Sequence, residues 1–160
     1  MIHAVKALIV TFGGSSSMKK PILVLALLFS FHLSAAEHEV KMLNAGPEGI
    51  MVFSPAYLNI DSGDTVHFVP TDQGHNSVSE FGPEGGVTWK GELGKPVSVT
   101  FDKEGLHAYQ CEPHSIMAMV GIVQVGKATN KEDFHRFVDS KEAMFVMNKG
   151  RFKAYGEQVK

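Results

Sequence analysis

One stretch organises this sequence: YQCEPHSIMAM, residues 109–119. It contains the only cysteine of the 160-residue chain, Cys111, together with an imidazole at His114 and two methionines. These are soft and borderline ligands, which select copper, zinc or iron over hard cations. A second histidine that suits the same ion lies far upstream, at His75. We therefore expect one metal ion to be held by four residues: His75, Cys111, His114 and Met119.

The spacing of these residues suits a metal-binding loop. Two residues separate Cys111 from His114, so a tight loop presents both side chains to one point, and Pro113 stiffens it by fixing its own φ. Met119 lies five residues beyond His114, which lets the chain turn back to that point, although Met117 competes for the same position. Two histidine nitrogens, a thiolate and a weak axial thioether form the ligand set of a blue-copper electron-transfer site, whereas methionine suits zinc poorly.

Cys111 has other interpretations. A lone cysteine is usually a small buried hydrophobic residue. With His75 or His114 it would also make a nucleophile and its base, and the chain would then be an enzyme. A copper-storage or copper-delivery protein is a further class. Strong visible absorption after Cu(II) addition favours the electron carrier, rapid alkylation of Cys111 favours the enzyme, and tight Cu(I) binding without a reversible redox wave favours the storage protein.

The N-terminal segment predicts export to the periplasm. Residues 18–20 form a basic start, an apolar run follows over residues 22–33, and Ser34-Ala35-Ala36 supplies the small residues that a signal peptidase needs. The apolar run is too short to span a membrane. We expect residues 1–36 to be a signal peptide, in which residues 1–17 are either a misassigned upstream start or an extension that is removed with it.

The composition of the chain is that of a globular protein and argues against nucleic-acid binding. With 44% apolar residues the chain can build a core, and a formal net charge of −2 does not point to nucleic acid. Removing residues 1–36 removes three of the 15 basic residues and none of the 17 acidic ones, which leaves a formal charge of about −5. We expect an acidic, soluble monomer that binds neither nucleic acid nor membranes.

Hydrophobic patterning predicts an all-β domain over residues 37–126. Short runs of β-branched and aromatic residues alternate with turn residues, a pattern typical of a β-sandwich or barrel. The clearest strand covers residues 95–101, and shorter candidate strands lie at 76–78 and 87–90.

Residues 127–160 predict a helical extension packed on this sandwich. Thr129 and Asn130 offer N-cap chemistry for a first helix, and Asp139 or Ser140 for a second. The apolar positions of the second helix are expected to pack against the sandwich: Met144, Phe145, Met147 and Phe152.

The order and spacing of the candidate ligands resemble the cupredoxins, and within them the pseudoazurin family. The resemblance covers nearly all of the chain after residue 36. The segments that carry it are Asn44 to Tyr57, Asp61 to Val66, Gly74-His75-Asn76, Cys111-Glu112-Pro113-His114 and Met117 to Gly121. The two predicted C-terminal helices complete it.

The resemblance implies an eight-stranded Greek-key β-sandwich that carries one type 1 copper ion, cycling between Cu(I) and Cu(II). The implied ligands are His75, Cys111, His114 and Met119. It also implies that Asn76 ties the two ligand loops together and donates from its backbone to the cysteine sulfur. Such a protein would be no enzyme but a periplasmic carrier of single electrons.

The resemblance also implies transient docking of redox partners near His114. A copper nitrite reductase or a c-type cytochrome would fit this role, with apolar residues from Ile116 to Ala118, and Pro83, as the contact surface. Pseudoazurins typically surround this surface with lysines. Here the flanking positions include Gln110 and Glu112, with further acidic residues at Glu80 and Glu84, and complementary charge governs the choice of partner.

Overall fold

The computed structural model describes residues 35–160. The predicted signal peptide and the possible upstream start therefore lie outside the described residues, except for Ala35 and Ala36. Within the described part, no helix is long and apolar enough to cross a membrane.

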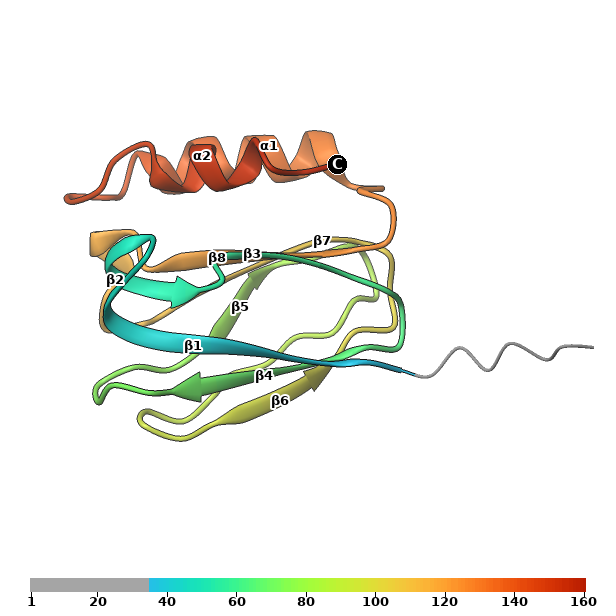
Figure 1. The fold of residues 1–160 in the computed structure, drawn as a ribbon. Coiled ribbons are helices and arrows are strands. Elements are labelled where there is room, and N and C mark those ends of the chain that lie inside the picture. The colour runs from blue at the N-terminus through green and yellow to red at the C-terminus, as the bar shows by residue number, and fades with distance from the viewer. Residues whose placement is uncertain (1–34) are drawn as a thin grey trace, which may run out of the picture. The chain divides into compact units, whose positions relative to one another are not determined.

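Eight strands form two four-stranded sheets (Figure 1). In chain order they are β1 (Glu37–Gly46), β2 (Gly49–Ser54), β3 (Tyr57–Ile60), β4 (Thr65–Pro70), β5 (Val78–Phe81), β6 (Val97–Thr100), β7 (Gly105–Gln110) and β8 (Val120–Val125). One sheet has the strand order β2-β1-β4-β6 and the other β3-β8-β7-β5. Both sheets are mixed, because β1 pairs with β4 and β3 pairs with β8 in parallel, and the other pairs are antiparallel.

The core between the sheets is built from alternating side chains. In β4, Val66 and Phe68 are fully buried while Thr65, His67 and Val69, which alternate with them, are only partly covered, as a strand with one face on a core requires. Aromatic rings fill the centre: Tyr109 contacts Phe53 and Phe68 edge to face, with ring centroids 4.7 and 4.8 Å apart. Cys111 and Met119 belong to the same buried cluster, so the candidate metal ligands grow directly out of the core.

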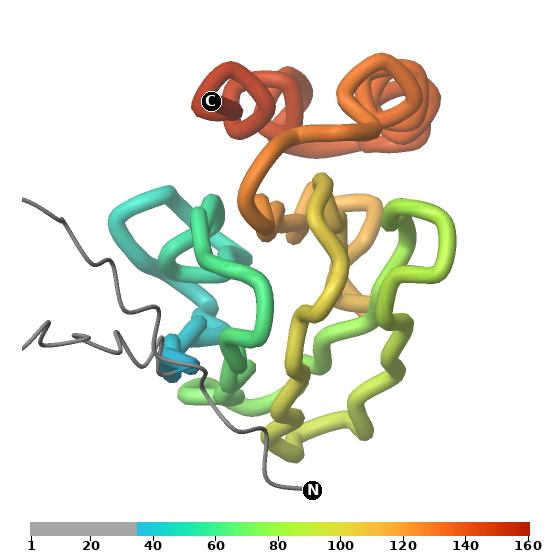
Figure 2. Tube along the Cα trace, turned by 90° about the vertical axis from the view of Figure 1, so that its right-hand side faces the viewer, coloured from blue at the N-terminus to red at the C-terminus, as the bar shows by residue number. Residues whose placement is uncertain are grey.

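Two helices cover the outer face of the second sheet (Figures 1 and 2). They are α1 (Lys131–Glu142) and α2 (Arg151–Gly156). Phe134 and Phe152 are almost completely buried against apolar residues of β7 and β8, such as Ala108 and Ile122. The prediction of a β-sandwich with about eight strands and two C-terminal helices is therefore confirmed.

The second helix does not begin where the sequence pattern placed it. Asp139 and Ser140 lie inside α1, and α2 begins only after Gly150, which adopts a left-handed φ of 85°. Met144 and Met147 consequently lie in the connection between the helices and are exposed rather than packed on the sandwich, although Phe145 and Phe152 are buried as predicted.

Two further local predictions were wrong. Residues 87–90 form no strand and contribute only an isolated bridge between Lys90 and Val78. Asn130 does precede α1, but its side chain caps nothing. It instead accepts from the backbone N–H of Leu106 at 2.7 Å and donates to the carbonyl of the same residue at 3.0 Å, which fastens the start of the helix to β7.

Candidate metal centre

Three of the four predicted ligands come from one loop between neighbouring strands. β7 leads into Cys111, the loop passes through His114 and a short 3₁₀ helix over Ser115–Met117, and β8 begins just after Met119. The backbone N–H of Cys111 donates to the carbonyl of Met119 at 3.0 Å, so the two ends of the loop are hydrogen-bonded to each other. His75 approaches from the other side, in the segment between β4 and β5.

The fold brings together the candidate ligand atoms of three residues. The Sγ atom of Cys111 lies 3.7 Å from Nδ1 of His75 and 3.4 Å from Nδ1 of His114, and the two nitrogens are 3.2 Å apart. Metal–nitrogen bonds of about 2.0 Å and a metal–sulfur bond of about 2.3 Å would place trigonal ligands roughly 3.5 to 3.7 Å apart. The three residues therefore fit one borderline-soft metal ion.

His75 is fully buried, and its ring is oriented by a residue that the sequence analysis overlooked. Its Nε2 atom lies 3.0 Å from Oδ1 of Asn44, near the end of β1. Because an amide oxygen only accepts, this contact places the ring proton on Nε2 and leaves Nδ1 free to bind a metal. Burial and the nearby His114 ring both lower the pKa of His75, which favours the neutral form that a ligand needs. Asn44 reaches His75 through the pairing of β1 with β4, which no local motif reveals.

Cys111 is also fully buried, and burial raises the pKa of its thiol. Backbone N–H groups of Asn76 and His114 face the sulfur and oppose this rise. The Asn76 side chain also accepts from the backbone N–H of Glu112 at 3.0 Å. Asn76 therefore connects the two ligand-bearing segments, the role that the resemblance implied for it.

The two loop methionines have different surroundings. Met119 is completely buried and packs in the same cluster as Cys111, whereas Met117 is partly exposed at the end of the 3₁₀ helix. Ala118, between them, adopts a left-handed φ of 57°, which reverses the direction of the chain. The loop therefore directs one thioether inward and leaves the other near the surface.

The comparisons with known proteins agree with this geometry. The model of the plastocyanin/azurin family of copper-binding proteins matches residues 40–126. A pseudoazurin from Paracoccus pantotrophus is 45% identical over 101 residues, which cover 62% of this chain and 70% of the relative. A solved structure of native pseudoazurin from Hyphomicrobium denitrificans has a TM-score of 0.66 and 38% identity, covering 78% of this chain and 98% of that chain. The chain belongs to the pseudoazurins.

Membership of the pseudoazurins settles the class of activity. Pseudoazurins are blue-copper electron carriers and not enzymes, so the chain is a copper-binding electron carrier and Cys111 is no catalytic nucleophile. The family binds one copper ion, and the group formed by His75, Cys111 and His114 suits it. The alternative of a copper-storage or copper-delivery protein is not favoured.

In this pseudoazurin the acidic residue of the ligand loop is not a free surface charge. One carboxylate oxygen of Glu112 accepts from Nζ of Lys90 at 2.7 Å and the other from the side-chain amide of Asn76 at 2.9 Å. These bonds hold the pKa of Glu112 below its usual range. Glu112 therefore joins three loops around the metal centre as well as modifying the charge of the surface.

Two residues expected beside the docking surface lie elsewhere. Pro83 and Glu84 line a cavity with Lys103, Glu104 and Asn130, next to the start of β7. The ligand loop begins at the other end of that strand. Pro83 therefore does not join the apolar residues around His114.

Proposed function

We propose that His75, Cys111, His114 and Met119 hold a single type 1 copper ion, with Met119 as the weak axial ligand. The observation that carries this proposal is the convergence of the first three on one point, with all their ligand atoms within 4.8 Å of one another. Met119 is preferred over Met117 because it is completely buried beside Cys111. When bound, the ion supplies a one-electron couple between Cu(II) and Cu(I).

The candidate ligands differ in how accessible they are to a partner. Cys111 and His75 are inaccessible, but His114 is partly exposed. The edge of the His114 ring is therefore the shortest way in and out for an electron. Redox partners would dock briefly over it, in the small and weak interfaces that such proteins use. A c-type cytochrome or a copper nitrite reductase would suit this role, with the protein acting as a monomer.

The proposed location is the periplasm. The basic start, apolar run and small residues up to Ala36 support removal of residues 1–36 as a signal peptide. Strand β1 begins at Glu37, the first residue after the proposed cleavage point. The mature protein would comprise the sandwich over residues 37–126 and the helical extension over residues 127–160.

Absorption spectroscopy with a matched pair of methionine variants tests the proposal. Adding Cu(II) should produce an intense visible band, and Cys111→Ser should abolish it. Met119→Leu should shift the band and raise the reduction potential, because it removes a thioether from the ion. Met117→Leu is the control and should leave both unchanged. Equal effects of the two leucine variants would refute the axial assignment, and a colourless protein would refute the copper site.

A further inference from the structure

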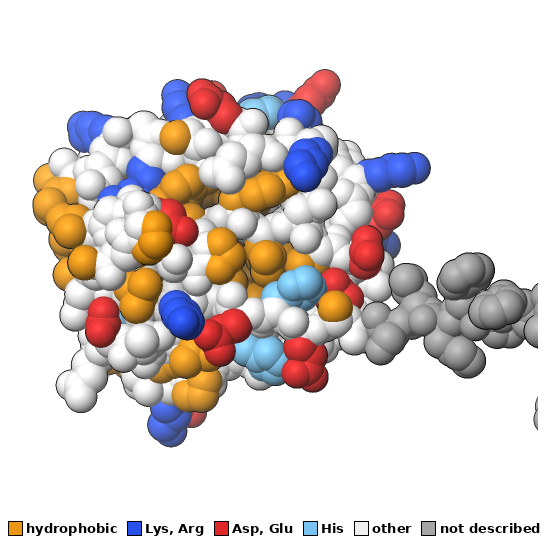
Figure 3. Space-filling model, in the orientation of Figure 1, with side chains coloured by type: hydrophobic (Ala, Val, Ile, Leu, Met, Phe, Trp, Pro, Cys, Tyr) orange, Lys and Arg blue, Asp and Glu red, His pale blue; other side chains and the backbone are white. Residues whose placement is uncertain are grey.

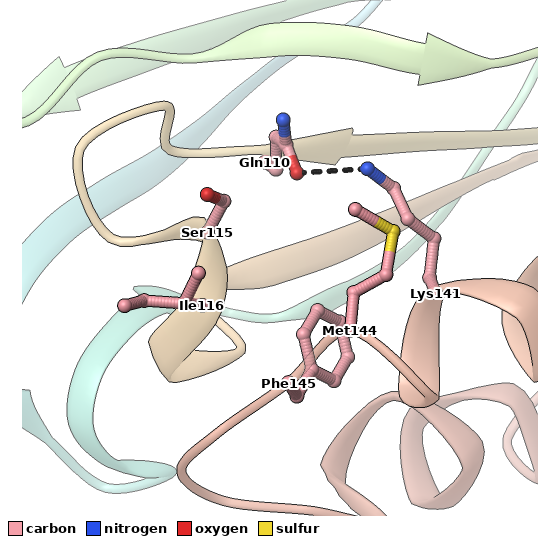
Figure 4. Close-up of a pocket in the computed structure, with 6 residues that line it drawn as sticks. All are labelled: Gln110, Ser115, Ile116, Lys141, Met144 and Phe145. Atoms are coloured by element: carbon pink, nitrogen blue, oxygen red, sulfur yellow. Dashed lines mark hydrogen bonds between the residues drawn. The ribbon is translucent and has the colours of Figure 1, made fainter.

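The seam between the helices and the sandwich is largely apolar, so each polar group in it needs a partner. Figure 3 shows hydrophobic side chains along this seam. At α1 the partners come from the chain itself: Nζ of Lys141 donates to Glu80 at 2.7 Å and to Gln110 at 3.1 Å, and the second of these bonds is drawn in Figure 4. Beside α2 the situation is different.

Three buried oxygen atoms beside α2 have no hydrogen-bond partner within residues 35–160. They are Oε2 of Glu48, in the turn between β1 and β2, and the phenolic oxygens of Tyr109 in β7 and Tyr155 in α2. Tyr109 and Tyr155 are only 1% and 8% exposed, so bulk water does not solvate their side chains. An unpaired buried polar group lowers stability, and a buried tyrosine usually has a hydrogen-bond partner. These three atoms therefore point to a ligand that binds them.

The three groups are neighbours although they lie far apart in the sequence. Burial raises the pKa of Tyr109, and Tyr155 and Glu48 raise it further. Burial also raises the pKa of Tyr155, with Arg151 opposing this rise and Glu48 adding to it. Glu48 and Tyr155 line one shallow cavity. Each group is therefore close to the other two, yet no two of them are hydrogen-bonded to each other.

Gly121 makes room for Tyr109 to reach this position. The two residues are directly opposite each other in the pairing of β7 with β8. A Cβ atom on Gly121 would overlap the phenol ring and its oxygen. The ring therefore lies across β8, with its hydroxyl group over the glycine, while it contacts Phe53 and Phe68 in the core. Tyr109 thus extends from the core of the sandwich toward α2.

We propose that Glu48, Tyr109 and Tyr155 bind one internal water molecule, which links β7 to α2. Both tyrosine hydroxyl groups donate to the water oxygen, and the water donates to Oε2 of Glu48. Three hydrogen bonds are typical of a buried water. The other carboxylate oxygen of Glu48 accepts from Oγ of Ser54 at 3.2 Å, which leaves Oε2 for the water. Because β7 leads into Cys111, the water connects the helical extension to the strand that precedes the ligand loop.

The charges at this point favour a neutral ligand. The carboxylate of Glu48 would repel an anion. Lys149 and Arg151 line the same shallow cavity as Glu48 and would oppose a cation. The cavity also gives water a route to Glu48 and Tyr155 from the surface. This site depends on the fold alone, so it does not rest on the assignment of the copper ligands.

A crystal structure and a double-mutant cycle test the water site together. In the copper-loaded protein one water should lie about 2.5–3.2 Å from all three oxygen atoms. Tyr109→Phe and Tyr155→Phe should each lower the urea midpoint of the reduced, copper-loaded protein by about 0.5–1 M, because each removes one bond to the water. The double variant should lose clearly less than the sum of the two, since both hydroxyl groups bind the same water.

Tyr57→Phe is the matched control, because the third tyrosine of the chain donates to Oε1 of Gln124 at 2.7 Å instead. Its loss should add to that of Tyr109→Phe. A direct hydrogen bond between any two of the three groups would overturn the proposal, as would a structure in which no water contacts them. Losses of Tyr109→Phe and Tyr155→Phe that add as fully as those of the control pair would do the same.

Discussion

Replacing Arg151 should weaken both the fold and the ligand loop. Arg151 is the first residue of α2, and one of its guanidinium nitrogens, Nη1, lies 3.0, 3.0 and 3.2 Å from the carbonyl oxygens of Ile50, Met51 and Ala118. Met51 and Ala118 both have a left-handed φ, of 48° and 57°, which costs an L-residue about 1–2 kcal/mol each. The arginine therefore binds the carbonyls of two strained residues, one of which directly precedes Met119.

The size of the effect follows from the number of hydrogen bonds. Nη1 carries two protons, so two of the three carbonyls are bonded at a time, and each bond to a charged donor contributes about 1.5–3 kcal/mol. Two effects reduce the total stabilisation from these bonds. Ile50 is 46% exposed, so water replaces part of its bond, and ordering the arginine side chain costs about 2 kcal/mol. We expect Arg151→Ala to lower the free energy of unfolding by about 2–3 kcal/mol.

Urea unfolding of the metal-free protein measures this change. Lys153→Ala is the matched control, because it removes a cation from the same helix whose partner, Asp139, is on the surface, and we expect a loss of stability close to zero. In the copper-loaded protein Arg151→Ala should also shift the visible band, since the loop next to Met119 loses its anchor. If Arg151→Ala and Lys153→Ala cost the same and the band does not move, Arg151 has no role in supporting the loop.

Three shorter predictions concern the packing and the pH dependence of the fold. The pKa of Asp64 is lowered, chiefly because its carboxylate is hydrogen-bonded to His38. The stabilisation from this carboxylate is therefore complete above the unfolded pKa of about 3.9 and is lost as the pH falls through the lower folded value. Asp64→Asn should flatten the acid side of a plot of stability against pH. A Cβ atom on Gly121 would overlap the Tyr109 ring, so Gly121→Ala should cost about 1–3 kcal/mol in urea unfolding, and adding Tyr109→Leu should recover part of that loss. Phe152→Ala should cost about 3–5 kcal/mol, seen as a lower thermal midpoint, because the ring is 1% exposed between the helices and the sheet.

Local chemistry explains why the ligand group could be predicted from the sequence. Cys111 and His114 are separated by two residues, and a loop that short leaves few ways to arrange them. The strands were predictable where one face is buried, as in β6, because the alternation of Val97 and Val99 with polar residues reports the buried face. The assignment of Met119 over Met117 remains a prediction, supported by their different burial.

The features that could not be predicted depend on contacts between distant segments. Asn44 orients His75 only because β1 pairs with β4, and a histidine carries no local sign of the partner of its second nitrogen. Likewise the ion pair of Glu112 with Lys90 joins two loops 22 residues apart. The sequence therefore showed an acidic residue in the ligand loop but not the lysine that neutralises it. Met144 and Met147 have the spacing of a helix face, but α1 ends at Glu142 and exposes both.

The ligand loop combines two requirements that oppose each other. Electron transfer with little rearrangement needs ligands that stay in place, and brief docking needs a surface that a partner reaches without displacing them. The loop satisfies both by changing direction at Ala118, so that Met119 and Cys111 lie in the core while Ile116 lies on the surface. Val146 and Met147 bond the backbone of Ile116 rather than its side chain, so the helical extension helps to hold this part of the loop while leaving the Ile116 side chain exposed. Changes to the exposed side chains should therefore alter the rate of electron transfer while leaving the visible absorption band in place. Changes that break the backbone contacts to Ile116 should alter both the rate and the band.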